Sequence, residues 1–253
     1  MGLSSTVLTR PYLPVPKTAM NPLLEIRDLT VCYHDGTRAL RGVDLSLGPA
    51  ERVALIGPNG AGKTTLLLAV MRGVPFGGGI TVEGLESSRR NAEAIRARCG
   101  MVFQQPDDQL FMPTLLEDVA FGPLNQGLSP AEAEERARQA IAAVGLGGRE
   151  SRGGHHLSGG EKRAAALATV LAMQVKLLLL DEPGADLDLR SRRRLTGLLA
   201  GRPEAMLLAT HDLDMAGRLC SRAVVMEAGE AVADGPIADI LADRALLAAH
   251  GLA

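Results

Sequence analysis

The sequence has no tryptophan, and only 2% of its 253 residues are aromatic. It also lacks an apolar run of the roughly 18 residues that a membrane span needs, since the leucine run at 177–180 is bounded by Lys176 and Asp181. Its 27 basic and 29 acidic residues are mixed along the chain, so no basic stripe indicates a nucleic-acid partner. These absences exclude a transmembrane subunit and a nucleic-acid-binding module, and any role at a membrane has to involve a partner.

Cysteine is scarce as well. Cys32, Cys99 and Cys220 are scattered, odd in number and each next to apolar residues, which predicts buried free thiols in a reducing compartment. The first 20 residues contain three prolines between Arg10 and Met20 and no apolar stretch long enough for a signal peptide. Residues 1–20 are therefore expected to form a flexible arm.

The apolar pattern predicts an α/β fold. Short alternating runs from Leu23 onwards, broken by turn residues, are typical of an antiparallel β subdomain. Nearly continuous apolar runs at 52–57, 175–183 and 205–212 predict strands that are buried on both faces. Because helical segments alternate with these strands, we expect a parallel core sheet with ligands at the carboxyl ends of its strands.

A helical region interrupts this sheet. The stretch from Ser129 to Gly145 begins with an N-cap serine and Pro130 and ends at a glycine, which predicts a helix. A further helix is expected at about 63–72, directly after a glycine-rich loop. The region at about 87–165, which contains the helix predicted after Ser129, is expected to form an inserted α-helical subdomain.

The segment GPNGAGKT, residues 57–64, fits the phosphate-loop pattern G-x-x-x-x-G-K-[ST] and lies between a predicted strand and a predicted helix. Lysine is rare here, four residues against 23 arginines, so a lysine at the position that the pattern requires argues against a chance glycine-rich turn. Backbone N–H groups would surround the phosphates, the lysine would reach the terminal ones and the threonine hydroxyl would bind Mg²⁺. The expected nucleotide-binding residues are Gly57, Pro58, Asn59, Gly60, Ala61, Gly62, Lys63, Thr64 and Thr65.

Polar residues at the ends of the next two strands complete this site. Asp181 is predicted to bind Mg²⁺ through water, and Glu182 to polarise the water that attacks the γ-phosphate. His211 could donate a hydrogen bond to that phosphate, although a histidine taken alone is more often a surface residue. Tyr33, one of two tyrosines, could stack on adenine; the alternative is a core tyrosine.

A second anion site is predicted where a helix begins at Ser158, Gly159, Gly160 and Glu161. A serine hydroxyl and the first free N–H groups of a helix bind negative charge, yet this segment has no lysine of its own. The neighbouring pair His155–His156 has no cysteine or acidic residue nearby, so we interpret it as loop rather than as a metal site.

Together these motifs resemble the ATP-binding subunits of ABC transporters over about residues 23–240. The resemblance rests on GPNGAGKT (57–64), FQQP (103–106), LSGGE (157–161, the signature), LLLLDEP (177–183), LD (187–188) and TH (210–211). It implies a nucleotide-binding domain at 21–246, a tail at 247–253, and ATP and Mg²⁺ as cofactors. It also implies head-to-tail pairing, in which the signature of one chain meets the γ-phosphate on the phosphate loop of the other.

The resemblance assigns further residues. Gln104 looks like the glutamine that senses Mg²⁺ and the membrane partner, and Asp188 like the aspartate at the dimer seam. Tyr33 looks like the adenine-stacking aromatic residue. Gly184 departs from the serine or threonine that is usual after the proline.

The segments 33–47, 102–129 and 157–173 are similar to the energy-coupling-factor type ATPases of cobalt and nickel uptake. This implies a peripheral subunit at the cytoplasmic face of the cell membrane, present as a homodimer or paired with a homologous ATPase. Its partners would be a transmembrane coupling protein and a separate membrane substrate-binding protein, with no nucleic acid. The alternatives are an importer of another substrate and a soluble ABC regulator, although the sequence lacks the regulator's second nucleotide domain or coiled-coil insertion. A phosphate-loop kinase would lack LSGGE.

An apolar cluster, Leu110, Phe111 and Met112, stands in a loop-like setting next to Pro113. Such side chains either pack inward or meet a partner, and we expect a groove for a short helix of the coupling protein. The acidic pair at 107–108 is interpreted as solvated rather than as a nickel or cobalt site.

Overall fold

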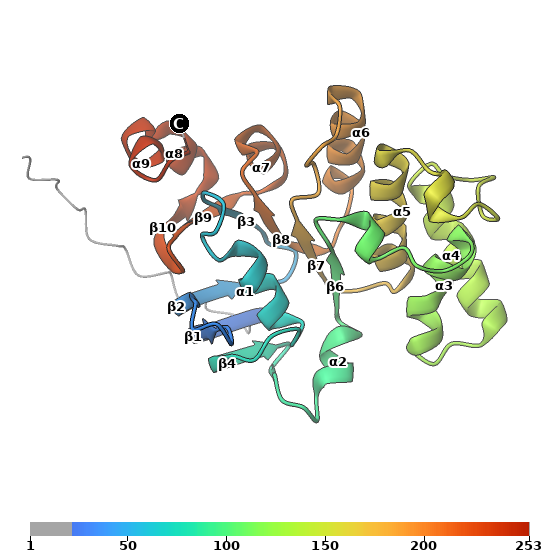
Figure 1. Ribbon diagram of the computed structural model, residues 1–253, viewed down its shortest axis with the longest axis horizontal. Coiled ribbons are helices and arrows are strands. Elements are labelled where there is room, and N and C mark those ends of the chain that lie inside the picture. The colour runs from blue at the N-terminus through green and yellow to red at the C-terminus, as the bar shows by residue number, and fades with distance from the viewer. Residues whose placement is uncertain (1–21, 253) are drawn as a thin grey trace, which may run out of the picture.

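The computed structural model describes residues 22–252, which form two β-sheets flanked by helices (Figure 1). The predicted flexible arm, residues 1–20, lies outside the described residues. The two sheets lie in the left and central parts of Figure 1, and the helices α3, α4 and α5 lie together at the right. This arrangement confirms the expected α/β architecture.

The smaller sheet is antiparallel, as the alternating pattern predicts. Its order is β2-β1-β4-β5, with bounds β1 Leu24–Cys32, β2 Arg38–Leu47, β4 Gly77–Val82 and β5 Leu85–Glu86. Gly36 has φ +86°, and the N–H of Tyr33 donates to the carbonyl of Thr37 at 2.9 Å, so a tight turn joins β1 to β2. The buried apolar residues of this sheet belong to the same core cluster as those of α1.

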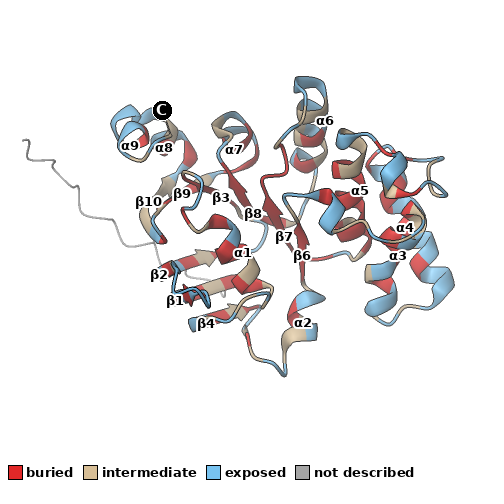
Figure 2. Cartoon of the chain, in the orientation of Figure 1, coloured by how far each residue is buried: buried red, intermediate tan, exposed pale blue. Residues whose placement is uncertain are grey.

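The core sheet has the order β10-β9-β3-β8-β7-β6. Its bounds are β3 Arg52–Ile56, β6 Cys99–Val102, β7 Leu177–Asp181, β8 Ala205–Thr210, β9 Arg222–Glu227 and β10 Glu230–Pro236. The strands from β9 to β6 are parallel, and β10 is antiparallel to β9. Buried residues fill the central strands (Figure 2), as expected for strands covered on both faces.

Strand β6 corrects the predicted boundary of the helical subdomain. It lies within the region 87–165 that was expected to be helical, yet it pairs with β7 in the core sheet, with Val102 opposite Leu180. A four-residue apolar run cannot be distinguished from a buried helical segment by periodicity. The helices of the subdomain follow this strand: α3 Leu115–Asn125, α4 Pro130–Ala143 and α5 Gly159–Ala172.

Helix α4 confirms the sequence prediction in detail. The Ser129 hydroxyl accepts from the N–H of Glu132, and the Glu132 carboxylate accepts from the N–H of Ser129 at 3.0 Å, forming a capping box. Gly145 has φ +73° just after the helix, a conformation that glycine adopts without strain. Local signals therefore fix both ends of α4.

Eight further helices, two of them short 3-10 helices, complete the described part of the chain. Their bounds are α1 Lys63–Val70, α2 Ala92–Arg96, the 3-10 helices η1 Pro106–Asp108 and η2 Gly154–His156, α6 Leu189–Ala200, α7 Leu213–Leu219, α8 Ile237–Ala242 and α9 Arg244–Ala249. The predicted tail boundary at 247 falls inside α9. Leu247 is buried in the main core, so at least this part of the tail belongs to the fold.

The cysteines follow the prediction only in part. Cys99 and Cys220 are buried free thiols, and burial raises the pKa of both to about 12. Cys32, in contrast, is exposed. Side chains alternate along β1, and because Val31 faces the core, Cys32 faces outward.

Candidate nucleotide site

The phosphate loop connects β3 to α1, as predicted, and other backbone segments surround it closely. A Cβ atom on Gly57 would lie 2.2 Å from the carbonyl oxygen of Met226. A Cβ atom on Gly62, which has φ +102°, would lie 2.7 Å from the carbonyl oxygen of Ala39. Only glycine fits these positions, and the loop is left with its N–H groups and the start of α1 to receive an anion.

Lys63 is buried at the start of α1 and folds back on the loop. Its Nζ donates to the carbonyl of Gly57 at 2.6 Å and to that of Pro58 at 3.1 Å, and it lies 3.9 Å from Oε1 of Glu182. Desolvation lowers the pKa of Lys63, opposed by the charges of Glu182 and Asp181. A buried ammonium with carbonyl partners on a phosphate loop suits an anionic ligand.

Asp181 and Thr64 provide adjoining oxygen atoms. Asp181 is buried at the end of β7, and its Oδ1 accepts from the Thr64 hydroxyl at 3.1 Å. Desolvation raises the pKa of Asp181, whereas Thr64 and Lys63 lower it. Two hard oxygen donors beside a phosphate loop fit Mg²⁺, which binds carboxylates together with phosphate oxygens.

Glu182 follows Asp181 and is also buried, with φ +44°. Its Oε2 accepts from the Thr210 hydroxyl at 3.0 Å, and its Oε1 lies 2.9 Å from Nδ1 of His211. Both partners come from the end of β8, so the structure brings together the predicted residues of two strands. The role of Thr210 as a partner of Glu182 was not predicted.

Tyr33 lies at the edge of this site and is 38% exposed, so it is not a core tyrosine. Its hydroxyl group is 3.1 Å from Oγ1 of Thr65, in the first turn of α1. This hydrogen bond holds the Tyr33 ring beside α1, the helix that follows the phosphate loop, and part of the ring remains exposed.

The signature begins α5. Ser158 is the N-cap, and it forms a capping box with Glu161. Its hydroxyl satisfies the N–H of Glu161, so the N–H groups of Gly159 and Gly160 remain for a ligand. A Cβ atom on Gly159 would meet nothing within 4 Å, whereas one on Gly160 would lie 2.9 Å from Oγ of Ser191. The signature is thus open on one side and packed against α6 on the other.

The structure does not join the signature to the phosphate loop of the same chain. Ser158 and Gly160 line a hollow together with Asp188 and Arg194, and no residue of 57–64 lines it. Asp188 is exposed and caps α6, since its Oδ1 accepts from the N–H of Ser191 at 2.9 Å. Each chain therefore presents two separate surfaces, the phosphate loop at the start of α1 and the signature at the start of α5.

Gln104 is exposed and follows β6. Because β6 and β7 are parallel neighbours, Gln104 lies at the carboxyl end of its strand, as Asp181 does. The next loop is connected to α5 by a residue that sequence reasoning missed. Gln109 accepts from the N–H of Phe103 at 3.2 Å and donates to the carbonyl of Ala166 at 3.0 Å. A glutamine in a polar loop gives no sequence signal that distinguishes such a contact from solvation.

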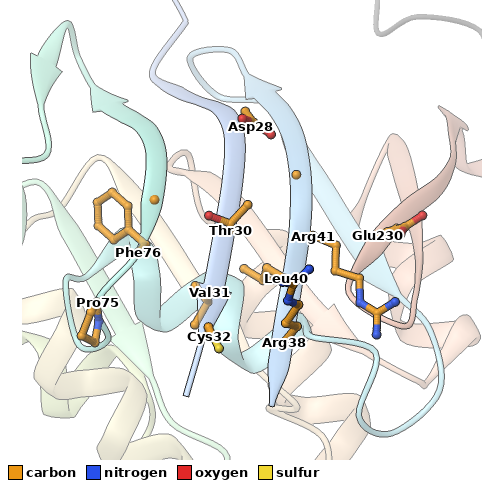
Figure 3. Close-up of a pocket in the computed structure, with 12 residues that line it drawn as sticks. Asp28, Thr30, Val31, Cys32, Arg38, Leu40, Arg41, Pro75, Phe76 and Glu230 are labelled. Atoms are coloured by element: carbon orange, nitrogen blue, oxygen red, sulfur yellow. The ribbon is translucent and has the colours of Figure 1, made fainter. Parts of the chain in front are cut away.

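A hollow of about 930 Å³ lies along β1 and β2. In Figure 3, the side chains of Asp28, Thr30 and Cys32 project from β1, with Arg41 and Glu230 to one side. No residue of the phosphate loop lines this hollow, so cavity size alone does not locate the nucleotide site.

Within residues 22–252, no helix is long and apolar enough to cross a membrane. The same residues contain no group of three or more histidine, cysteine or acidic side chains arranged to bind a metal ion. The rings of His155 and His156 lie 4.0 Å apart in a short 3-10 helix.

The phosphate loop after β3 and the acidic pair after β7 define a phosphate-loop NTPase. The model of the ABC transporter family matches residues 40–185, more than half of the chain, so the chain belongs to this family. It is an ABC-type ATPase, the ATP-binding subunit of a transporter. These findings confirm the resemblance drawn from the motifs.

Individual relatives agree with this assignment. A putative ABC transporter ATP-binding protein of Gloeobacter violaceus is 51% identical over 233 residues, covering 90% of this chain and 95% of the relative. The energy-coupling factor transporter ATP-binding protein EcfA of Methanothermobacter thermautotrophicus is 41% identical over 232 residues, covering 89% and 74%. The solved structure of cbiO1 from Clostridium perfringens, part of the ABC transporter complex cbiONQ, has a TM-score of 0.79 and 31% identity, covering 92% and 96%.

Proposed function

We propose that this chain is the motor subunit of a membrane importer for cobalt or nickel and acts through a transmembrane coupling protein. The likeness to cbiO1 over nearly the full length of both chains carries this proposal. The similarity to EcfA supports the energy-coupling-factor type. An importer of another substrate is the second candidate, because several relatives are named only as ABC transporter ATP-binding proteins.

The proposed subunit is a peripheral protein at the cytoplasmic face of the membrane. Its partners are the coupling protein, a separate membrane substrate-binding protein and a second ATPase subunit, and nucleic acid is not among them. The motor does not contact the transported ion, which is consistent with the nearly balanced charge of the chain.

In the proposed site, Lys63 exchanges the carbonyl groups of Gly57 and Pro58 for the terminal phosphates of ATP. Thr64, Asp181 and Gln104 are the proposed ligands of Mg²⁺, which neutralises phosphate charge when bound. The close contacts of Gly57 and Gly62 support a phosphate site here, because neither position has room for a side chain and the loop backbone can approach a ligand.

Glu182 is the proposed base, which takes a proton from the attacking water. The Thr210 hydroxyl and Nδ1 of His211 orient its carboxylate, as their distances of 3.0 and 2.9 Å indicate. When Nδ1 donates to Glu182, Nε2 of His211 can donate to the γ-phosphate only if the ring is protonated.

Two copies are proposed to pair head to tail, so that Ser158, Gly159 and Gly160 of one chain meet the γ-phosphate on Lys63 of the other. The openness of Gly159 and the exposed position of Asp188 support this pairing. A solved structure of MJ0796, described as a dimeric bacterial ABC transporter cassette, has a TM-score of 0.76 and 26% identity to this chain.

The coupling protein is proposed to dock on an apolar surface that we call the docking patch: Phe111, Phe121 and Leu124. These side chains are 62%, 41% and 44% exposed, and the two phenylalanine rings are 5.3 Å apart, edge to face. The predicted neighbours Leu110 and Met112 are half-buried instead. Exposed apolar side chains grouped in this way support a partner that covers them.

Replacement of Phe111 by serine tests this patch. We expect the Phe111→Ser subunit to keep its ATPase activity and to melt within about 2 °C of the unmodified protein, because the side chain is mainly exposed. Co-purification with the membrane partner should be lost. The measurements are thermal denaturation, ATP hydrolysis and pull-down of membrane protein.

Val119→Ser, in the same helix as Phe121, is the matched control. Val119 is fully buried, so this change should lower the melting temperature by several degrees. A similar loss of stability in Phe111→Ser, or normal assembly of that variant, would show that the patch is not a docking surface at this residue.

Tyr33 gives a prediction for nucleotide affinity. Tyr33→Ala should weaken ATP binding about tenfold, because stacking on a base contributes on the order of 1–3 kcal/mol. Tyr33→Phe keeps the ring and loses only the bond to Thr65, so its affinity should remain near that of the unmodified protein. Fluorescence titration with a labelled nucleotide measures both, and equal losses would contradict stacking.

Metal uptake tests the substrate assignment. Cells without this chain should accumulate less cobalt or nickel, measured by elemental analysis, and the unmodified chain should restore uptake. The Glu182→Gln chain, which assembles but does not hydrolyse, should not restore it. If the content of both metals is the same with and without the chain, the importer carries another substrate.

A further inference from the structure

A buried arginine connects the signature helix to Glu182 of the same chain. Arg163 belongs to α5 and is 4% exposed. Its Nη1 donates to the backbone carbonyl of Glu182 at 3.5 Å, and its Nη2 donates to that of Ala185 at 3.1 Å. Both acceptors lie in the turn that follows β7, so a side chain of one helix contacts the backbone of the proposed base.

That turn has an unusual backbone. Glu182 has φ +44° and Asp186 has φ +58°, a left-handed conformation that residues with a side chain rarely adopt. Such a conformation persists when surrounding contacts determine it. The N–H of Ala185 donates to the carbonyl of Glu182 at 3.0 Å, and the N–H of Glu182 donates to the carbonyl of Ala209 in β8 at 2.8 Å. Arg163 provides two further contacts from outside the turn, to the carbonyl groups of Glu182 and Ala185.

The charge of Arg163 stays near the acidic residues without pairing to them. Desolvation lowers its pKa, while Asp186, Glu182 and Asp181 favour the cation. Among the described residues, no carboxylate lies within ion-pair distance of its guanidinium, and its hydrogen bonds go to carbonyl oxygens. Arg163 can therefore fix the turn without contacting the Glu182 carboxylate.

We infer that Arg163 is a positioning residue for hydrolysis, which transmits the position of α5 to Glu182 through the backbone of this turn. The inference rests on the proposed head-to-tail pairing, in which the signature and Glu182 of one chain belong to two different nucleotide sites. The packing of α5 in its own chain then holds the base of that chain's site, while the signature at the start of the same helix serves the site of the partner. Arg163 links the two sites.

Arg163→Met removes both donors and keeps an unbranched side chain. Its kcat should fall about 100-fold, because a small displacement of a reacting group costs about that much. The KM for ATP should change by less than about twofold, since the phosphate loop is untouched. Arg163→Lys, which keeps the charge and can reach one carbonyl, should recover part of kcat. An unchanged kcat, or a rise in KM that accounts for the loss of kcat/KM, overturns the inference.

The Arg222→Met variant is a control that shows whether the loss of a buried arginine lowers kcat simply by destabilising the fold. Arg222 is a second largely buried arginine, with bonds to Asp234 and to the carbonyl of Ser46, remote from the turn. Its loss should lower the melting temperature while kcat per folded molecule stays the same. If Arg222→Met lowers kcat as much as Arg163→Met does, the effect is structural and the inference is wrong.

Mixed dimers show in which site Arg163 acts. A Lys63→Ala chain and a Ser158→Arg chain together form one intact site, whose phosphate loop and Glu182 both belong to the Ser158→Arg chain. Arg163→Met added to that chain should lower kcat about 100-fold, and the same change in the Lys63→Ala chain should lower it much less. The inference is wrong if Arg163→Met lowers kcat more in the Lys63→Ala chain than in the Ser158→Arg chain. If the mixture with both arginines intact is inactive, the head-to-tail pairing itself fails.

Discussion

Glu182→Gln should lower steady-state ATP hydrolysis about 1000-fold, within the range that a general base contributes. An amide keeps the size of the side chain and can still accept from the Thr210 hydroxyl, but it cannot take a proton from water. ATP affinity should be retained, because the phosphate loop and the Asp181–Thr64 pair are unchanged. The closed dimer should accumulate with ATP, which size-exclusion chromatography measures together with the hydrolysis rate.

Glu134→Gln is the matched control for this change. Glu134 lies on the exposed side of α4 and pairs with Arg138 at 2.7 Å, so its loss should leave hydrolysis unchanged. Undiminished hydrolysis in Glu182→Gln would remove Glu182 as the base. A loss of ATP binding equal to the loss of hydrolysis would make it a binding residue instead.

Much of the nucleotide site could be predicted because its residues stand next to strong local signals. The phosphate loop and the pair Asp181–Glu182 each follow a continuous apolar run, and such runs are buried strands here. Parallel strands end at one edge, so the sequence alone indicated that Glu182 and His211 come together. The structure places His211 Nδ1 at 2.9 Å from Glu182.

Contacts between distant segments could not be predicted in this way. Arg163 stands in a helical pattern where an arginine is normally solvated, and only the packing of α5 on the turn after β7 makes it buried. Gly184 is similar. A Cβ atom there would lie 2.6 Å from Cε of Met215 in α7, so Gly184 packs directly against the end of this side chain. Neither neighbour is visible in the local sequence.

Mixing two inactive variants should restore activity if each site takes its signature from the other chain. Lys63→Ala removes the phosphate contact, and Ser158→Arg places a bulky side chain at the exposed start of α5. In a heterodimer, both defects fall in one site and the other site is intact. Random pairing should therefore restore about a quarter of the unmodified activity, provided that one site hydrolyses alone.

The matched control is a mixture of Lys63→Ala with Glu182→Gln. Lys63 and Glu182 of one chain belong to the same site, with Nζ and Oε1 3.9 Å apart, so every site in that mixture keeps one defect. This mixture should stay inactive at all ratios, whereas the first should show maximal ATPase activity at equal amounts of the two chains. Two different affinity tags on the chains measure heterodimer formation directly. If tagged heterodimers of Lys63→Ala and Ser158→Arg form and remain inactive, the signature does not act on the nucleotide of the partner.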